Sequence, residues 1–307
     1  MYNNNSRGTS YTAGFFMLIA FTVAALIAAS LISIIVWRQM TGLGFDKMVT
    51  DMGNPAYANT MKVIQVINAT VGFLLPAIVT AAILNRKPMA LLGFSSNIKF
   101  NQAGLVIGIT IFGLLVSSSL AYFNEQIPVP ASWKITFDKW EAEYNEQINA
   151  IISLKSFTDY ILALVLIAFL PALCEEALFR GGFQNFLTRS TKMPWLSIII
   201  VSIIFSAVHV SFYGFLSRFF LGVMLGAIFH YSGKLWLSIL AHFVTNGLAV
   251  TVLYVLTRQG KPATEAMQED VTSYWGIIFL PAVIGLFIVF KRVSRNRKPD
   301  QLPVNGI

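Results

Sequence analysis

The sequence predicts an all-α fold, a polytopic integral membrane bundle of about eight transmembrane helices. Hydrophobic residues make up 56% of the 307 residues, and charged residues make up only 12%. Soluble domains usually carry about 25% charged residues, so this chain has too little polar surface for a soluble fold. The apolar residues also gather in runs of about 20, the length that crosses a bilayer. We therefore expect a single membrane domain over residues 1–307, with the lipid bilayer as a partner.

Eight apolar runs justify this number of spans. They occupy residues 13–37, 61–84, 102–123, 158–180, 195–210, 213–230, 235–256 and 274–291. The first run exceeds the apolar region of a signal peptide, about 7–15 residues, and no convincing cleavage site follows it, so we expect a retained span. The connection between the fifth and sixth runs, Ser211 to Gly214, is very short. These two runs are compatible with a tight helical hairpin or with one broken passage.

Positive charges in the connections predict the orientation. They follow the second, fourth, sixth and eighth spans: Arg86, Lys87, Lys99, Arg189, Lys192, Lys234, Lys291, Arg292, Arg295, Arg297 and Lys298. The other connections are balanced or acidic. Because cytoplasmic loops are enriched in Lys and Arg, both termini are expected in the cytoplasm. We expect a multi-pass protein of a cell membrane, in a prokaryotic plasma membrane.

The net charge of +8 fits this orientation and does not indicate a nucleic-acid partner. No basic face is interleaved with aromatic residues that could stack on bases. The single cysteine, Cys174, excludes an internal disulfide and a CxxC metal site.

The longest connection, roughly residues 124–157, contains a mixed polar and apolar segment. From Trp133 to Leu154 the segment combines charged residues with tryptophans and isoleucines. This pattern is compatible with an amphipathic helix on the outer membrane interface. A solvated connecting loop is the alternative.

Three charged residues stand at the end of the fourth run. Successive residues of a helix are about 100° apart, so Glu175 and Glu176 point in different directions. Glu176 and Arg180 are four residues apart and can pair on one face. Glu175 is then left without a local cation, and a desolvated carboxylate of this kind suits a general base. The alternative is a solvated helix end in the headgroup region, since Gly181 and Gly182 follow.

Histidine and asparagine residues interrupt two later runs. His209 closes the fifth run, one turn after Phe205, and could simply hydrogen-bond a neighbouring carbonyl. His242 and Asn246 are four residues apart in the seventh run and project from one face. Their alternative role is hydrogen bonding between helices. The remaining histidine, His230, is expected only to pack or to reach the membrane surface.

A glutamate, two histidines and an asparagine can activate a water molecule and stabilise an oxyanion. Glu175, His209 and His242 could equally hold a divalent metal such as zinc, and a site without metal is as compatible with these residues. The sequence has neither the HExxH pattern of many zinc proteases nor a GxSxG nucleophile motif.

The order of these motifs resembles a known family. Glu-Glu-x3-Arg, Phe-x3-His and His-x3-Asn, each on its own apolar run, resemble the CPBP family of intramembrane proteases. This family comprises the type II CAAX prenyl proteases and the bacteriocin-processing Abi group. The resemblance covers residues 158–256, which we expect to be the catalytic core spans.

The resemblance implies a role for each motif residue. Glu175 is implied to be the general base, and Glu176 to be a supporting acid paired with Arg180. Phe205 is implied to shape the substrate pocket.

The histidine and asparagine residues also receive implied roles. His209 would hold or polarise the attacking water, or bind a metal. His242 and Asn246 would stabilise the oxyanion or complete a metal site.

These roles predict an endopeptidase that hydrolyses a peptide bond near the cytoplasmic membrane face. Its substrate would be a peptide, a lipidated protein or a membrane protein. The alternatives are a non-catalytic immunity factor or scaffold with the same fold, and a small transporter, for which no repeat between the halves is evident.

Overall fold

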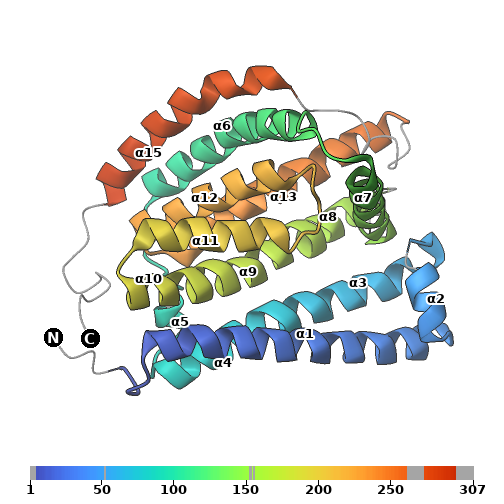
Figure 1. Ribbon diagram of the computed structural model, residues 1–307, viewed down its shortest axis with the longest axis horizontal. Coiled ribbons are helices and arrows are strands. Elements are labelled where there is room, and N and C mark those ends of the chain that lie inside the picture. Colours follow the sequence, from blue (N-terminus) through green and yellow to red (C-terminus); the bar gives the residue numbers. More distant parts are fainter. Residues whose placement is uncertain (1–4, 52, 152–153, 155, 261–272, 295–307) are drawn as a thin grey trace.

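The computed structural model describes residues 5–51, 53–151, 154, 156–260 and 273–294, and the described chain is a bundle of helices (Figure 1). The helices before the long connection are α1 (Tyr11–Thr41), α2 (Phe45–Thr50), η1 (Pro55–Tyr57), α3 (Ala58–Ile67), η2 (Asn68–Leu74), α4 (Leu75–Leu84), α5 (Pro88–Leu91) and α6 (Phe100–Glu125). Those that follow are α7 (Ala131–Ile151), α8 (Phe157–Ala163), η3 (Leu164–Phe169), α9 (Leu170–Glu176), η4 (Ala177–Gln184), α10 (Asn185–Thr191), α11 (Pro194–Ala207), α12 (Phe215–Ser232), α13 (Leu235–Arg258), η5 (Tyr274–Phe279) and α15 (Leu280–Ser294). The predicted all-α membrane bundle is confirmed.

Seven helical segments within the described residues are long and apolar enough to cross a bilayer. They are Tyr11–Thr41, Pro55–Leu84, Phe100–Glu125, Phe157–Thr191, Phe215–Ser232, Leu235–Arg258 and Tyr274–Ser294. The expected fifth span is the exception, because α11 has only 14 residues. At 1.5 Å per residue it covers about 21 Å, less than the roughly 30 Å of a bilayer core. The helix stops early because the chain bends at residues 208–214, where Val210 has a φ of 49°.

The fifth and sixth runs form two separate helices. α11 and α12 lie side by side, joined by the bend at residues 208–214 (Figure 1). Of the two arrangements left open by the sequence, the hairpin is the one present.

The long connection contains a helix rather than a loop. α7 covers most of the segment from Trp133 onward, and the side chains of residues 144–151 lie outside the described part. In Figure 1 α7 lies beside the bend between α11 and α12. Its place at a membrane interface stays a prediction.

The fourth span is longer than expected, and its glycines do not end it. The helix runs without a break from Phe157 to Thr191 and includes two π-helical stretches, η3 and η4. Gly181 and Gly182 lie inside η4, where they allow close packing. A Cβ atom on Gly181 would lie 2.9 Å from the Leu92 carbonyl oxygen, and one on Gly182 would lie 2.6 Å from Leu18. The expectation of a helix end at these glycines was therefore wrong.

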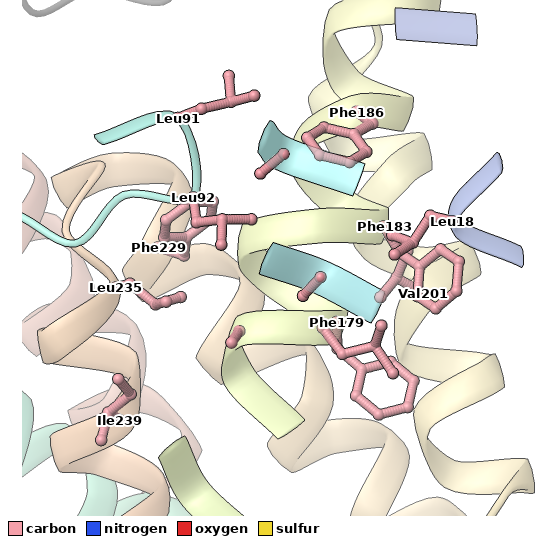
Figure 2. Packing of buried hydrophobic residues seen from close by; sticks show 14 of the residues in the cluster. Leu18, Leu91, Leu92, Phe179, Phe183, Phe186, Val201, Phe229, Leu235 and Ile239 are labelled. Atoms are coloured by element: carbon pink, nitrogen blue, oxygen red, sulfur yellow. The ribbon is translucent and has the colours of Figure 1, made fainter. Parts of the chain in front are cut away.

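A hydrophobic core surrounds this long helix. Phe179, Phe183 and Phe186 follow one another along it and belong to a cluster that also contains residues of α1, α4, α11, α12 and α13 (Figure 2). A second cluster joins α6, α12, α13 and α15. The fourth span is thus fixed on several sides, which holds its polar residues in place.

The start of α1 and the end of α15 lie at the same end of the bundle (Figure 1). α5 and α10, which flank the connections bearing Lys87 and Lys192, lie at that end too. Arg295, Arg297 and Lys298 lie outside the described residues. Which end faces the cytoplasm stays a prediction of the loop charges.

Candidate active site

The two adjacent glutamates lie about halfway along the 35-residue helix Phe157–Thr191. We expected them at its end, near the membrane surface. The difference arises because the helix continues through Gly181 and Gly182 for several more turns. Glu176 is 0% exposed, and the Glu175 side chain is 19% exposed. The alternative of a solvated helix end is therefore wrong.

Glu176 is the centre of a buried ionic group. Its Oε1 atom lies 3.0 Å from Arg180 Nη1, as the four-residue spacing predicts. The same oxygen accepts a hydrogen bond from His242 Nδ1 at 3.0 Å. The contact with Arg180 meets the distance of an ion pair, whereas the N–H direction does not meet hydrogen-bond geometry. The carboxylate thereby joins the fourth span to α13.

Arg180 has further partners that balance its buried charge. Its side chain is 1% exposed, and Nη2 donates to the carbonyl oxygen of Gly222 on α12 at 3.2 Å. Its guanidinium carbon lies 4.5 Å from the centre of the Phe205 ring. A cation over an aromatic face is stabilised by the ring quadrupole. Three helices therefore converge on this one side chain.

Glu175 approaches the other nitrogen of His242. The distance from Glu175 Oε2 to His242 Nε2 is 4.0 Å, too long for a direct hydrogen bond. Oε2 of Glu175 and Oε2 of Glu176 are both buried without a hydrogen-bond partner among the described residues. Buried acceptors of this kind are unusual and point to a polar group that the site receives.

His209 lies just beyond the end of α11, in the bend. Its Nδ1 is 2.7 Å from the carbonyl oxygen of Phe205. Because a carbonyl oxygen can only accept, Nδ1 carries the proton. In the neutral ring Nε2 is then free to accept a hydrogen bond.

The Phe205 ring joins the two histidines. It meets the His209 ring at 5.0 Å and the His242 ring at 5.8 Å between centroids, both edge to face. Phe179 packs against the same ring at 5.3 Å. Phe205, which is 4% exposed, therefore packs against both histidines and against Arg180.

Asn246 lies one turn after His242 on the same face of α13. It is partly exposed, and its amide has no hydrogen-bond partner among the described residues. The amide is therefore available as a donor beside His242.

His230 is apart from this group. It lies in the last turn of α12, eight residues beyond Gly222, and packs against Tyr231 at 5.2 Å. Eight helical residues span about 12 Å, so a different part of the bundle surrounds it.

The described residues contain no group of three or more His, Cys, Asp or Glu side chains arranged to hold a metal ion. Glu175, His209 and His242 therefore do not form such a group among the described residues. The Nδ1 atoms of both histidines are engaged by other groups, which leaves Nε2 as the available nitrogen of each. Metal binding by these residues stays a prediction of the sequence.

Sequence reasoning missed several contributors to the site. The Gly222 carbonyl and the Phe179 ring carry no signal in their own segments. Asn124, at the end of α6, donates to the Phe212 carbonyl at 2.8 Å and accepts from Leu216 N–H at 3.1 Å. In the sequence, only the position of Asn124 at the end of an apolar run could have indicated such contacts.

Comparison with known families identifies a domain at this position. Residues 157–248 match the family model described as type II CAAX prenyl endopeptidase Rce1-like. The match contains every residue of the ionic group and ends two residues after Asn246. The chain has no significant match among curated proteins or solved structures.

Proposed function

We propose that this protein is an intramembrane endopeptidase of the CAAX-processing or bacteriocin-processing type, because residues 157–248 match the Rce1-like family model, which supports a CAAX-type intramembrane protease fold. One observation carries the proposal. The Glu176–Arg180–His242 group neutralises its own charges and leaves Glu175 facing His242 Nε2 across 4.0 Å. A separation of 4.0 Å would let one water molecule bridge these two atoms by hydrogen bonds.

In the proposed reaction Glu175 removes a proton from this water. The hydroxide oxygen then forms a bond to the carbonyl carbon of the substrate, and the carbonyl oxygen becomes an oxyanion. Glu175 passes the proton to the nitrogen of the leaving peptide as the C–N bond breaks. General acid–base assistance of this kind contributes about 10²–10⁴-fold in rate.

The other residues would orient the water and the oxyanion. His209 Nε2 can accept a hydrogen bond from the water because its Nδ1 proton is bound to the Phe205 carbonyl. The Asn246 amide can donate to the oxyanion. His242, whose Nδ1 is held by Glu176, presents its Nε2 to the same water.

The buried position of Glu175 favours a substrate that is delivered within the membrane. Such a substrate carries a lipid anchor or a transmembrane segment. The loop charges point to release of the product on the cytoplasmic side.

The Glu175→Gln variant tests the mechanism. The amide keeps the size of the side chain but cannot take a proton, so turnover should fall at least 10²-fold. Hydrolysis is measured in proteoliposomes on a farnesylated CAAX-terminated peptide, its unlipidated form and a transmembrane peptide. Glu143→Gln is the matched control, because its carboxylate is half-exposed and pairs with Lys139 within α7.

Full activity of Glu175→Gln, or no hydrolysis of any of these peptides by the wild type, would sink the proposal. A biological phenotype that survives in Glu175→Gln would favour a non-catalytic immunity or scaffold role. Metal analysis of the purified protein decides between a zinc-dependent and a metal-free reaction. Stoichiometric zinc in active protein, with loss of activity on chelation and recovery on zinc addition, would replace the metal-free route.

A further inference from the structure

His209 stands outside regular secondary structure, although the proposed function needs it in a fixed place. α11 ends at Ala207, and the His209 N–H reaches only the Ser206 carbonyl at 3.3 Å. The next residue, Val210, has a φ of 49°. A β-branched residue at positive φ is a genuine outlier, and it persists only where the surroundings hold it.

α6 holds the far side of this bend. The Asn124 side chain is 1% exposed and bonds both the Phe212 carbonyl and the Leu216 N–H. One side chain therefore fixes an acceptor within the bend and a donor in the first turn of α12. An alanine at this position would leave both groups without that partner.

α7 holds the near side of the bend by stacking and by one short hydrogen bond. The rings of Phe137 and Phe212 stack at 4.2 Å with an angle of 4°. Ser211 donates its hydroxyl proton to Glu141 Oε2 at 2.6 Å and accepts from the Gly214 N–H at 3.2 Å. The Ser211 hydroxyl therefore links the Glu141 carboxylate of α7 to the backbone of the bend.

A second carboxylate of α7 lies one turn earlier. Asp138 Oδ1 accepts the hydroxyl proton of Tyr213 at 2.6 Å, and its Oδ2 lies 3.0 Å from Lys134 Nζ. Asp138 and Glu141 thus bind two neighbouring hydroxyls of the bend. In Figure 1 α7 and the end of α11 lie next to each other.

We propose that Asn124, with Asp138 and Glu141 of α7, positions His209 by holding the bend at residues 208–214. These side chains are positioning residues, because none of them belongs to the catalytic group. The inference rests on the proposed endopeptidase and assigns the helix that is absent from the matched family segment a task in the same reaction. Misplacement of a reacting group by about 1 Å can cost roughly 10²-fold in rate.

Histidine-selective isotope labelling gives a direct test, because the chain has only three histidines. NMR spectra of the full-length protein are recorded in detergent micelles and assigned with single His→Gln variants. Asn124→Ala and the Asp138→Asn, Glu141→Gln double variant should shift or broaden the His209 signal. The His230 signal should stay in place, because that residue lies at the far end of α12.

Kinetics provide the second readout. In both variants kcat should fall about 10- to 100-fold, with little change in KM and with the melting temperature retained. The matched controls are Asn101→Ala, exposed near the start of α6, and Glu143→Gln, which pairs with Lys139 within α7. Both controls should keep kcat and all three histidine signals.

Two outcomes would overturn the inference. One is an unchanged His209 signal with unchanged kcat in Asn124→Ala and in the double variant. The other is an equal change of all three histidine signals, which would indicate general destabilisation. A variant that does not fold is replaced by Tyr213→Phe, which removes only one hydroxyl contact. Failure of the endopeptidase proposal is separate, because it appears in Glu175→Gln while the NMR result still stands.

Discussion

The two halves of the candidate site are built in different ways. Glu175, Glu176 and Arg180 lie on one long helix, and His242 lies on a second helix packed against it. His209 instead lies in a bend, held by side chains of α6 and α7. The first half is fixed by a buried ion pair and a hydrophobic core, whereas the second depends on a few polar contacts. The proposed catalytic group therefore combines a part fixed within its own two helices with a part that side chains of other elements hold in place.

The largest effect on stability is expected from breaking the ion pair in the first half of the site. Arg180→Met removes the cation and leaves Glu176 buried beside His242 without it. Removing one partner of a buried pair costs about 3–5 kcal/mol, so the variant should unfold at a much lower temperature. Thermal unfolding in detergent, followed by circular dichroism, measures this change.

The Arg180→Met, Glu176→Gln double variant sharpens the result. With both charges removed the penalty should be smaller than in Arg180→Met alone. A double variant that is less stable than Arg180→Met would show that the pair itself, and not the orphaned charge, dominates the stability. Glu175→Gln serves as control, because Glu175 has no ion-pair partner as close as 3 Å and should keep the melting temperature.

A moderate effect is expected from crowding the contact that aligns the same helix. A Cβ atom on Gly181 would lie 2.9 Å from the Leu92 carbonyl oxygen, which belongs to the backbone. The backbone has little freedom there, because Asn185 also donates to the Leu91 carbonyl at 2.7 Å. Gly181→Ala should therefore cost about 1–3 kcal/mol, as overpacked cores do.

Gly104→Ala is the matched control for Gly181→Ala. A Cβ atom at Gly104, in α6, meets nothing within 4 Å. Alanine there should be neutral or stabilise the helix by up to about 1 kcal/mol. Equal melting temperatures for the two variants would show that the helix can shift to admit a methyl group.

Sequence spacing predicted the first half of the site far better than the second. The pairing of Glu176 with Arg180 follows from four residues of one helix, and the shared face of His242 and Asn246 follows in the same way. The apolar runs likewise predicted seven spans, because burial in lipid needs about 20 such residues, whereas the fifth run forms only the 14-residue α11. Local sequence patterns are sufficient to predict contacts between residues of a single helix.

Contacts between distant segments were beyond this reasoning. Asn124 and Phe212 are 88 residues apart, and Glu141 and Ser211 are 70 apart. No local pattern indicates that these segments meet. The end of the fourth span was missed for a related reason, since Gly181 and Gly182 serve packing against Leu92 and Leu18. From sequence alone a glycine pair predicts a helix end, because the neighbouring helix that it packs against is not known.

The smallest effect is expected from changing the pH, which acts on the contact between α7 and the bend that carries His209. The Tyr213 hydroxyl, which donates to Asp138, and then Lys134 hold the pKa of Asp138 below its usual range. A carboxyl whose pKa is lowered on folding stabilises the fold above its unfolded pKa, about 4, and loses this contribution as pH falls through the folded value. Contact between α7 and the bend should therefore be constant at neutral pH and weaken only below about pH 4.

Tyr213→Phe tests the sign of this effect. Loss of the hydroxyl should raise the pKa of Asp138 towards its usual value, because the largest cause of the lowering is removed. Carboxyl-selective NMR measures this pKa, with Asp46, exposed on α2, as the reference carboxyl. In the wild type the His209 signal should follow the protonation of Asp138, and in Tyr213→Phe this dependence should be lost, because Asp138 contacts the bend through that hydroxyl. A wild-type His209 signal that ignores the protonation of Asp138 would remove Asp138 from the proposed supports of the bend and leave Asn124 and Glu141 in that role.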